Sequence, residues 1–117
     1  MKKCYIAGKV TGLPEAEYRA KFRKAEIAVS ILGFEPLNPI TLPHEHDKSW
    51  ESYMRDAIRE MLDCEALYAL ADWKDSRGAR IEVQLAQDLG MQIIYERLLS
   101  TAPVKIIRER DTFWMGE

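Results

Sequence analysis

The 117-residue chain lacks several features that mark particular classes of protein. It contains no run of 18 apolar residues, which a membrane-spanning helix would need, and its short basic start is unlike a signal peptide. Its two cysteines, Cys4 and Cys64, do not have the CxxC spacing of metal or redox sites. We therefore expect a cytoplasmic protein in which both cysteines act as small apolar side chains rather than as a disulfide, metal ligands or nucleophiles.

The sequence also lacks an excess of positive charge. Its 17 lysines and arginines and 19 acidic residues give a net charge of −2, which would not attract nucleic acid or a membrane surface. The predicted partner is therefore a small molecule or a second copy of the chain. With 47% hydrophobic and 31% charged residues, the composition is typical of one globular domain, and we expect residues 1–117 to form it.

Two kinds of apolar segment alternate along the chain. Short apolar runs between turn residues predict buried strands, whereas apolar residues at helical spacing predict helices. Strands are expected at residues 3–7, 34–37, 66–71, 92–95 and 104–107, and helices at 14–32, 50–62 and 78–89. Residues 40–49 are expected to form a loop, and residues 108–117 a flexible or partner-docking tail. The alternation predicts a doubly wound α/β fold, a flavodoxin-like or Rossmann-like three-layer sandwich with a parallel sheet of about five strands.

Ligands of such folds bind beyond the carboxyl ends of the strands, so the residues that follow the strands should share one rim. The candidate substrate-binding residues there are Gly8, Lys9, Thr11 and Gly12 after the first strand, Asn38 after the second, and Ser76, Gly78 and Arg80 after the third. Glycines and a helix start at such a turn leave backbone amides free for a phosphate. The alternative is that these glycines serve the turn alone and that the serine only caps a helix.

Glu82 is the least expected residue of the third predicted helix. It falls on the predicted apolar stripe of this helix, which consists of Ile81, Leu85, Ala86 and Leu89. Burying an ionised carboxylate is costly, and apolar surroundings raise its pKa, so we expect this group to serve chemistry or a partner. The alternative is a carboxylate that only favours the helix dipole. Glu82 lies too deep in the helix, however, to form a capping box with Ser76.

Other chemically interesting residues have plainer interpretations. Asp56 lies on the polar side of its predicted helix among basic residues, which favours a surface ion pair. Trp50 and Tyr53 would suit stacking on a ligand, but their spacing fits core packing better. His44 and His46 have no third ligand at metal spacing, so no metal site is expected.

Several short segments resemble a known family. They are YIAG at residues 5–8, NP at 38–39, YMRD at 53–56 and DSRGARIE at 75–82. Together they are similar to the nucleoside 2-deoxyribosyltransferase superfamily, including its deoxynucleoside 5'-monophosphate N-glycosidase branch. The resemblance spans about residues 3–96, and it looks closest to a small, poorly characterised branch.

The resemblance implies roles for individual side chains. In the family, the glutamate matching Glu82 is the nucleophile that attacks C1' of the sugar. The acid matching Asp56 assists the leaving base, and the tyrosine matching Tyr5 orients the nucleophile. Ser76 matches a position that is Ser in the monophosphate hydrolases and Asp in transferases that hold a free 5'-hydroxyl, which favours a 5'-phosphorylated substrate. Arg80 stands where the family often has glycine, so it would fill part of the sugar pocket or contact the phosphate.

The expected function is therefore cleavage of the N-glycosidic bond of a nucleoside 5'-monophosphate or nucleoside, by hydrolysis or base exchange, without a metal or cofactor. One alternative is a non-catalytic nucleotide-binding or sensing domain of the same fold. Another is a structural subunit in which Glu82 pairs with Arg77 or Arg80. The family completes its site from a neighbouring subunit, so a homodimer or larger homo-oligomer is expected. The apolar residues 113–115 of the tail are candidates to dock on that neighbour.

Overall fold

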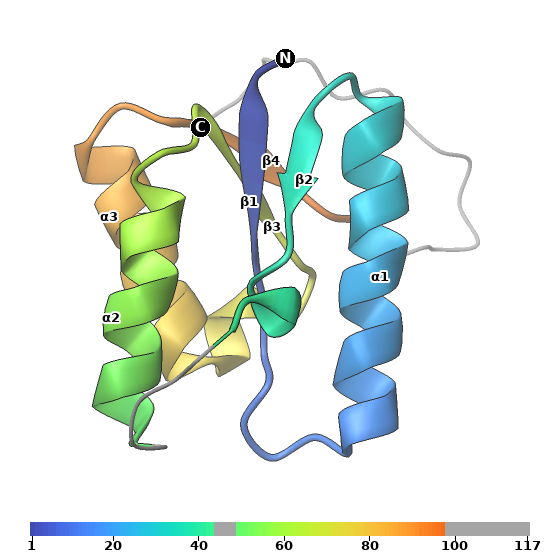
Figure 1. Ribbon diagram of the computed structural model, residues 1–117, viewed down its shortest axis with the longest axis vertical. Coiled ribbons are helices and arrows are strands. Elements are labelled where there is room, and N and C mark those ends of the chain that lie inside the picture. The colour runs from blue at the N-terminus through green and yellow to red at the C-terminus, as the bar shows by residue number, and fades with distance from the viewer. Residues whose placement is uncertain (44–48, 98–117) are drawn as a thin grey trace.

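The computed structural model describes residues 1–43 and 49–97 and shows a parallel sheet between two layers of helices (Figure 1). The strands are β1 (Lys3–Ala7), β2 (Glu35–Leu37), β3 (Ala66–Ala69) and β4 (Gln92–Tyr95), and their order in the sheet is β2-β1-β3-β4. The helices are α1 (Glu15–Ile31), α2 (Trp50–Met61) and α3 (Arg77–Asp88). Two 3-10 helices span Pro39–Thr41 and Trp73–Asp75. The doubly wound α/β fold predicted from the sequence is confirmed.

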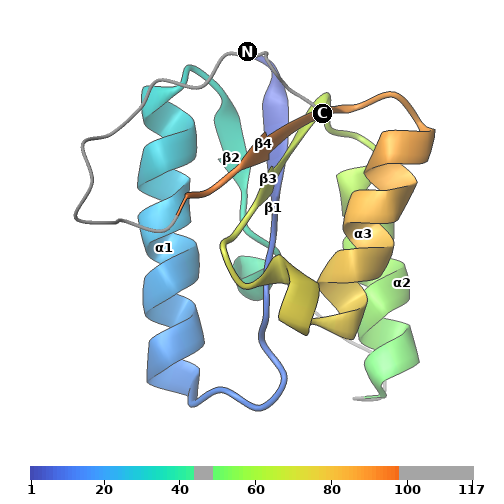
Figure 2. The same ribbon diagram turned by 180° about the vertical axis from the view of Figure 1, so that it is seen from behind.

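The alternation of side chains along the strands produces the three layers. In β1, Cys4 and Ile6 pack in the cluster that α1 covers, whereas Tyr5 and Ala7 pack in the cluster that α2 and α3 cover. Figures 1 and 2 show α1 on one face of the sheet and α2 with α3 on the other. Because both faces are covered, β1 is apolar and buried from its second residue onward.

Glycines and capping groups set where the elements end. Gly33 adopts a φ of +96° and ends α1. The N–H of the next residue, Phe34, donates to the carbonyl of Val29 at 3.2 Å, so β2 begins one residue later than predicted. β3 ends at Ala69, two residues early. The reason is that Leu70 accepts the first hydrogen bond of the next 3-10 turn, from the N–H of Trp73 at 2.9 Å.

Some expectations concern residues outside the described part of the chain. The predicted strand at 104–107, the tail at 108–117 and the two loop histidines, His44 and His46, belong to this group. Of the helices in residues 1–43 and 49–97, none combines the length and apolar character that a membrane crossing requires.

Candidate active site

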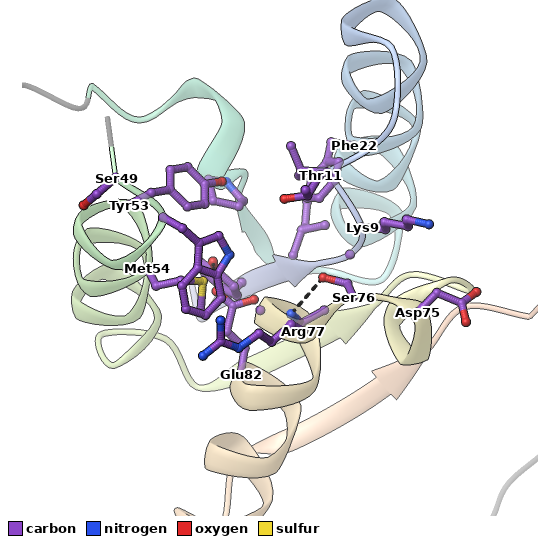
Figure 3. A pocket seen from close by; sticks show the side chains of 18 residues that line it. Lys9, Thr11, Phe22, Ser49, Tyr53, Met54, Asp75, Ser76, Arg77 and Glu82 are labelled. Carbon is purple, nitrogen blue, oxygen red and sulfur yellow. Dashed lines mark hydrogen bonds between the residues drawn. The ribbon is translucent and has the colours of Figure 1, made fainter. Parts of the chain in front are cut away.

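A cavity of about 670 Å³ lies at the carboxyl end of the sheet, next to the point where the chain turns to opposite faces of it (Figure 3). Its walls come from β1 and the loop that follows, from Phe22 of α1, and from the first turns of α2 and α3. It is large enough for a nucleotide-sized ligand. The rim predicted from the sequence therefore does contain a hollow.

Glu82 reaches this cavity one turn into α3, and its side chain is only 5% exposed. The buried face of α3 that it shares consists mainly of Ala79, Val83 and Ala86. The predicted apolar stripe was partly wrong, because Ile81 and Leu89 are exposed. Ala86 is buried as predicted, and the small side chains of this face let α3 lie close to the sheet. The expectation that Glu82 is buried is nevertheless confirmed.

Tyr5 holds the buried carboxyl. The hydroxyl of Tyr5, on the central strand β1, donates a hydrogen bond of 2.6 Å to Oε2 of Glu82. Burial raises the pKa of Glu82 to about 7, although the hydrogen bond from Tyr5 opposes the increase. Near neutral pH, the carboxyl is therefore divided between its protonated and ionised forms.

No cation neutralises Glu82 among the residues that the structure describes. Cζ of Arg77 lies 4.1 Å from the centroid of the Trp50 ring. Arg80 donates from Nη1 to the carbonyl of Lys74 at 2.8 Å. Neither arginine therefore forms the ion pair with Glu82 that was expected if the protein were only a structural subunit.

Two tyrosines in the cavity are kept protonated by their surroundings. Burial and the nearby Glu82 raise the pKa of Tyr5 well above its usual value. The same two causes raise the pKa of Tyr53 to about 12. Both phenols therefore remain hydrogen-bond donors at any pH at which the protein would work.

The loop after β1 forms one wall of the cavity through Gly8, Lys9 and Thr11. Oδ1 of Asp72 accepts the backbone N–H of Lys9 at 3.1 Å, and the other oxygen of Asp72 pairs with the ammonium group of Lys21. These bonds anchor the loop to the segment that follows β3. The cavity is thus held by contacts between loops from neighbouring strands.

The predicted glycines have different tasks. A Cβ at Gly8 would lie 2.4 Å from Cδ1 of Leu70, so this glycine permits close packing of the loop on the end of β3. Gly12 has a φ of +89° and does not line the cavity, so it serves the turn. At Gly78 a Cβ would lie 2.9 Å from Sδ of Met54, so this glycine lets α2 and α3 meet beside the cavity.

Ser76 also lines the cavity, and it is the N-cap of α3. Its Oγ accepts the N–H of Ala79 at 3.1 Å, the bond shown dashed in Figure 3. Arg80 is not among the lining residues and instead borders a shallow groove on the outer side of α3, next to Ile81 and Leu85. The structure therefore brings Ser76, but not Arg80, to the cavity.

Asn38 and Asp56 also lie outside the cavity lining. The amide of Asn38 is buried, donating to Oε2 of Glu26 and accepting from the N–H of Ile40, each at 2.9 Å. It therefore caps the following 3-10 turn. Asp56 accepts a 2.9 Å hydrogen bond from Arg59, as the interpretation from the sequence alone favoured. Its role toward the leaving base stays a prediction.

The structure adds cavity residues that were not selected from the sequence. Trp50 and Tyr53 line the cavity rather than forming only core contacts, and Arg77 joins them from the start of α3. The sequence did contain a signal for these residues, because the first turns of α2 and α3 each follow a loop at the carboxyl end of the sheet. Helical spacing alone could not show that these two helix starts face each other.

The family of the chain follows from comparison with known proteins. Among curated proteins, no significant match to the chain was found. A family model described as "Domain of unknown function (DUF4406)" matches residues 2–95. The matched part contains every residue that lines the cavity. Because the match covers well over half of the sequence, the chain belongs to the DUF4406 family.

Proposed function

We propose that the protein cleaves the N-glycosidic bond of a nucleoside 5'-monophosphate or nucleoside, with Glu82 as the nucleophile. The observation that carries this proposal is the Glu82 carboxyl itself. It is buried at the cavity wall, fixed by the hydroxyl of Tyr5, and without a cationic partner among the described residues. Such an arrangement costs stability and is typical of a group kept for chemistry.

The chemistry needs a carboxylate in this position. As the bond from C1' to the base nitrogen breaks, its electron pair goes to the base and positive charge develops at C1'. An oxygen of Glu82 then forms a bond to C1', giving a covalent glycosyl-enzyme. The base leaves after gaining a proton. Water attacks C1', displaces Glu82 and completes a hydrolysis, whereas a second base in its place completes a transfer.

The resemblance to the nucleoside 2-deoxyribosyltransferase superfamily supports these assignments. It gives the nucleophile role to Glu82 and the orienting role to Tyr5, and these two side chains form the 2.6 Å hydrogen bond in the structure. The resemblance also assigns leaving-base assistance to Asp56. This carboxylate is one turn beyond Tyr53 on α2, and its side chain is 16% exposed. We propose that it supplies or relays the proton that the base takes up.

A 5'-phosphorylated substrate is favoured by the residue at the start of α3. Ser76 is neutral, and its hydroxyl retains a proton to donate while its oxygen caps the helix. An aspartate here would repel a phosphate, whereas the positive end of the helix dipole attracts it. We therefore propose nucleoside 5'-monophosphates as the preferred substrates.

The test incubates the protein with a panel of nucleosides, deoxynucleosides and their 5'-monophosphates. Liquid chromatography measures the free base that is released. Glu82→Gln preserves the size of the side chain but removes the nucleophile, so base release should fall about 10³-fold or more. Glu35→Gln is the matched control, because Glu35 is exposed on β2 and pairs in register with Lys3, at the opposite end of β1 from the cavity.

Two results would argue against this function. Base release that survives Glu82→Gln would remove Glu82 from the chemistry. A folded wild type that releases no base from any member of the panel, with or without an acceptor base, would favour a nucleotide-binding or sensing domain instead.

A further inference from the structure

The cavity contains a pair of side chains that the proposed chemistry does not use. Arg77 is the first residue of α3 and Trp50 is the first residue of α2. The guanidinium carbon of Arg77 lies over the Trp50 ring, 4.1 Å from its centroid, and both residues line the cavity. This distance is that of a stacked cation–π contact.

Stacking fixes the arginine without consuming its hydrogen-bond donors. The guanidinium carbon lies over the indole ring. A cation–π contact uses the charge and not the N–H groups, so these groups keep their capacity to bind an oxyanion. Glu82 lines the same cavity, yet the two residues form no ion pair. The contact with Trp50 thus holds a positive charge at the cavity without neutralising the carboxylate.

Other charged side chains of the lining do not share this orientation. Figure 3 shows Lys9 and Asp75 pointing away from the cavity, whereas Arg77 extends from the start of α3 toward α2. The backbone N–H of Lys9 is bound by Asp72. Within the part of the chain that the structure describes, Arg77 is therefore the cation best placed to meet a ligand.

We propose that Arg77, positioned by Trp50, is a specificity-determining residue that binds an anionic group of the ligand and so selects nucleoside 5'-monophosphates over nucleosides. This inference rests on the proposed function, because it assumes a nucleotide in the cavity. A guanidinium matches a phosphate through two parallel N–H···O bonds, which a neutral hydroxyl cannot accept equally well. Arg77 supplies charge, which the hydroxyl of Ser76 lacks.

The test is titration calorimetry on Glu82→Gln, which binds without turnover, using 2'-deoxynucleosides and their 5'-monophosphates. We expect each monophosphate that binds to do so about tenfold or more tightly than its nucleoside. Adding Arg77→Gln should remove this preference while changing nucleoside affinity less than about twofold. Arg77→Lys in its place should retain only part of the preference for monophosphates, because a lysine keeps the positive charge but lacks the two parallel N–H donors of the guanidinium. Arg23→Gln, exposed on α1, is the matched control.

A further variant tests whether Trp50 positions Arg77. Trp50→Leu leaves Arg77 charged but unsupported, so it should weaken monophosphate binding by about three- to tenfold. Inorganic phosphate alone should compete only weakly, since the nucleoside supplies the remaining contacts. The inference would be overturned by equal loss of monophosphate and nucleoside affinity in Arg77→Gln, by equal affinity for the two ligands in the parent, or by no binding of either.

This experiment separates the inference from the proposed function. If the wild type releases no base but selects monophosphates through Arg77, the inference holds for a binding domain and the catalytic proposal fails. If base is released equally well from nucleosides and monophosphates whether or not Arg77 is present, the catalytic proposal holds and the inference fails.

Discussion

At the scale of single residues, Glu82 links the stability of the protein to pH. Its carboxyl has an ordinary pKa of 4.5, which burial raises to about 7 in the folded chain. Between these two values the folded state binds more protons than the unfolded state, so stability falls as pH rises. The total loss is about 3 kcal/mol, from 1.36 kcal/mol for each unit of pKa.

Glu82→Gln should remove this loss, because a glutamine is neutral at every pH. At pH 8 the variant should be more stable than the wild type by about 3 kcal/mol, and at pH 5 by less than about 1 kcal/mol. Urea unfolding at the two pH values measures the difference, with Glu35→Gln as the control. Equal stability of wild type and variant at pH 8 would mean that the buried carboxylate is compensated after all.

Catalysis should respond to pH in the opposite direction from stability. The nucleophile must be ionised, so kcat/KM should rise through pH 7 and level off above it. Tyr5→Phe removes the hydrogen bond that lowers the pKa of Glu82, so the midpoint of this rise should move to higher pH. Base-release rates between pH 5 and 9 measure both. A lower rate with an unmoved midpoint would contradict the role given to the phenol.

Individual site residues were unequally predictable. Glu82 stood out in the sequence because a carboxylate on an apolar helix face is costly whatever the fold. Asn38 looked like a rim residue, but its amide satisfies a buried turn, and a sequence does not distinguish these uses. The contact of Arg77 with Trp50 joins two helix starts that are 27 positions apart, so no local pattern could reveal it.

At the scale of elements, the loop after β1 depends on two glycines for different reasons. Gly8→Ala would place its Cβ 2.4 Å from Cδ1 and 2.9 Å from Cβ of Leu70, and relieving that overlap must shift the loop or Leu70. We expect a loss of about 1–3 kcal/mol and impaired ligand binding. Gly12→Ala meets nothing within 4 Å, but its φ of +89° costs about 1–2 kcal/mol, with binding largely kept. Thermal unfolding and ligand titration of both variants separate strain from packing.

The start of α3 combines a structural and a functional task in Ser76. Ser76→Asp should keep the cap, because aspartate accepts the same N–H and favours the helix dipole, so stability should change by less than about 0.5 kcal/mol. The added negative charge should lower base release from 5'-monophosphates by about tenfold or more, without a matching loss for nucleosides. Ser76→Ala, which loses the cap, should instead cost about 1 kcal/mol. Equal losses on both substrates would contradict a phosphate at this position.

The limits of elements were predicted well where neighbouring residues set them, and poorly where a long-range contact does. The helices at residues 14–32 and 50–62 were close because glycine, proline and serine mark their limits. The strand expected at 66–71 stops at Ala69, because the 3-10 turn begins at Leu70 and the N–H of Ala71 then donates to the carboxylate of Glu96 and not to the sheet. That bond spans 25 positions and depends on the finished fold.

At the scale of the whole molecule, the layer arrangement followed from the sequence alone. A strand apolar on both faces must be covered twice, and alternation with helices then fixes a parallel sheet. Tyr5 belongs to such a strand, and its partners in register, Leu37 and Leu67, belong to the strands on either side. The hydroxyl of Tyr5 could not be predicted to meet Glu82, because that contact depends on how closely α3 approaches the sheet.

Self-association is the prediction that belongs to this scale. The resemblance implies a site completed by a neighbouring subunit, so we expect a homodimer or larger assembly. Size-exclusion chromatography with light scattering measures it, and a species of 13.5 kDa would contradict it. Specific activity should also fall when the protein is diluted below the concentration at which subunits separate.

The hydrogen bond between Tyr5 and Glu82 joins residues 77 positions apart. During synthesis, therefore, the first strand must wait for most of the chain before its hydroxyl finds this partner. Before α3 packs against β1, the burial that raises the pKa of Glu82 is absent, so the carboxyl keeps its ordinary acidity. The buried carboxyl therefore forms only after strand β1 and helix α3 have both been made and have packed together.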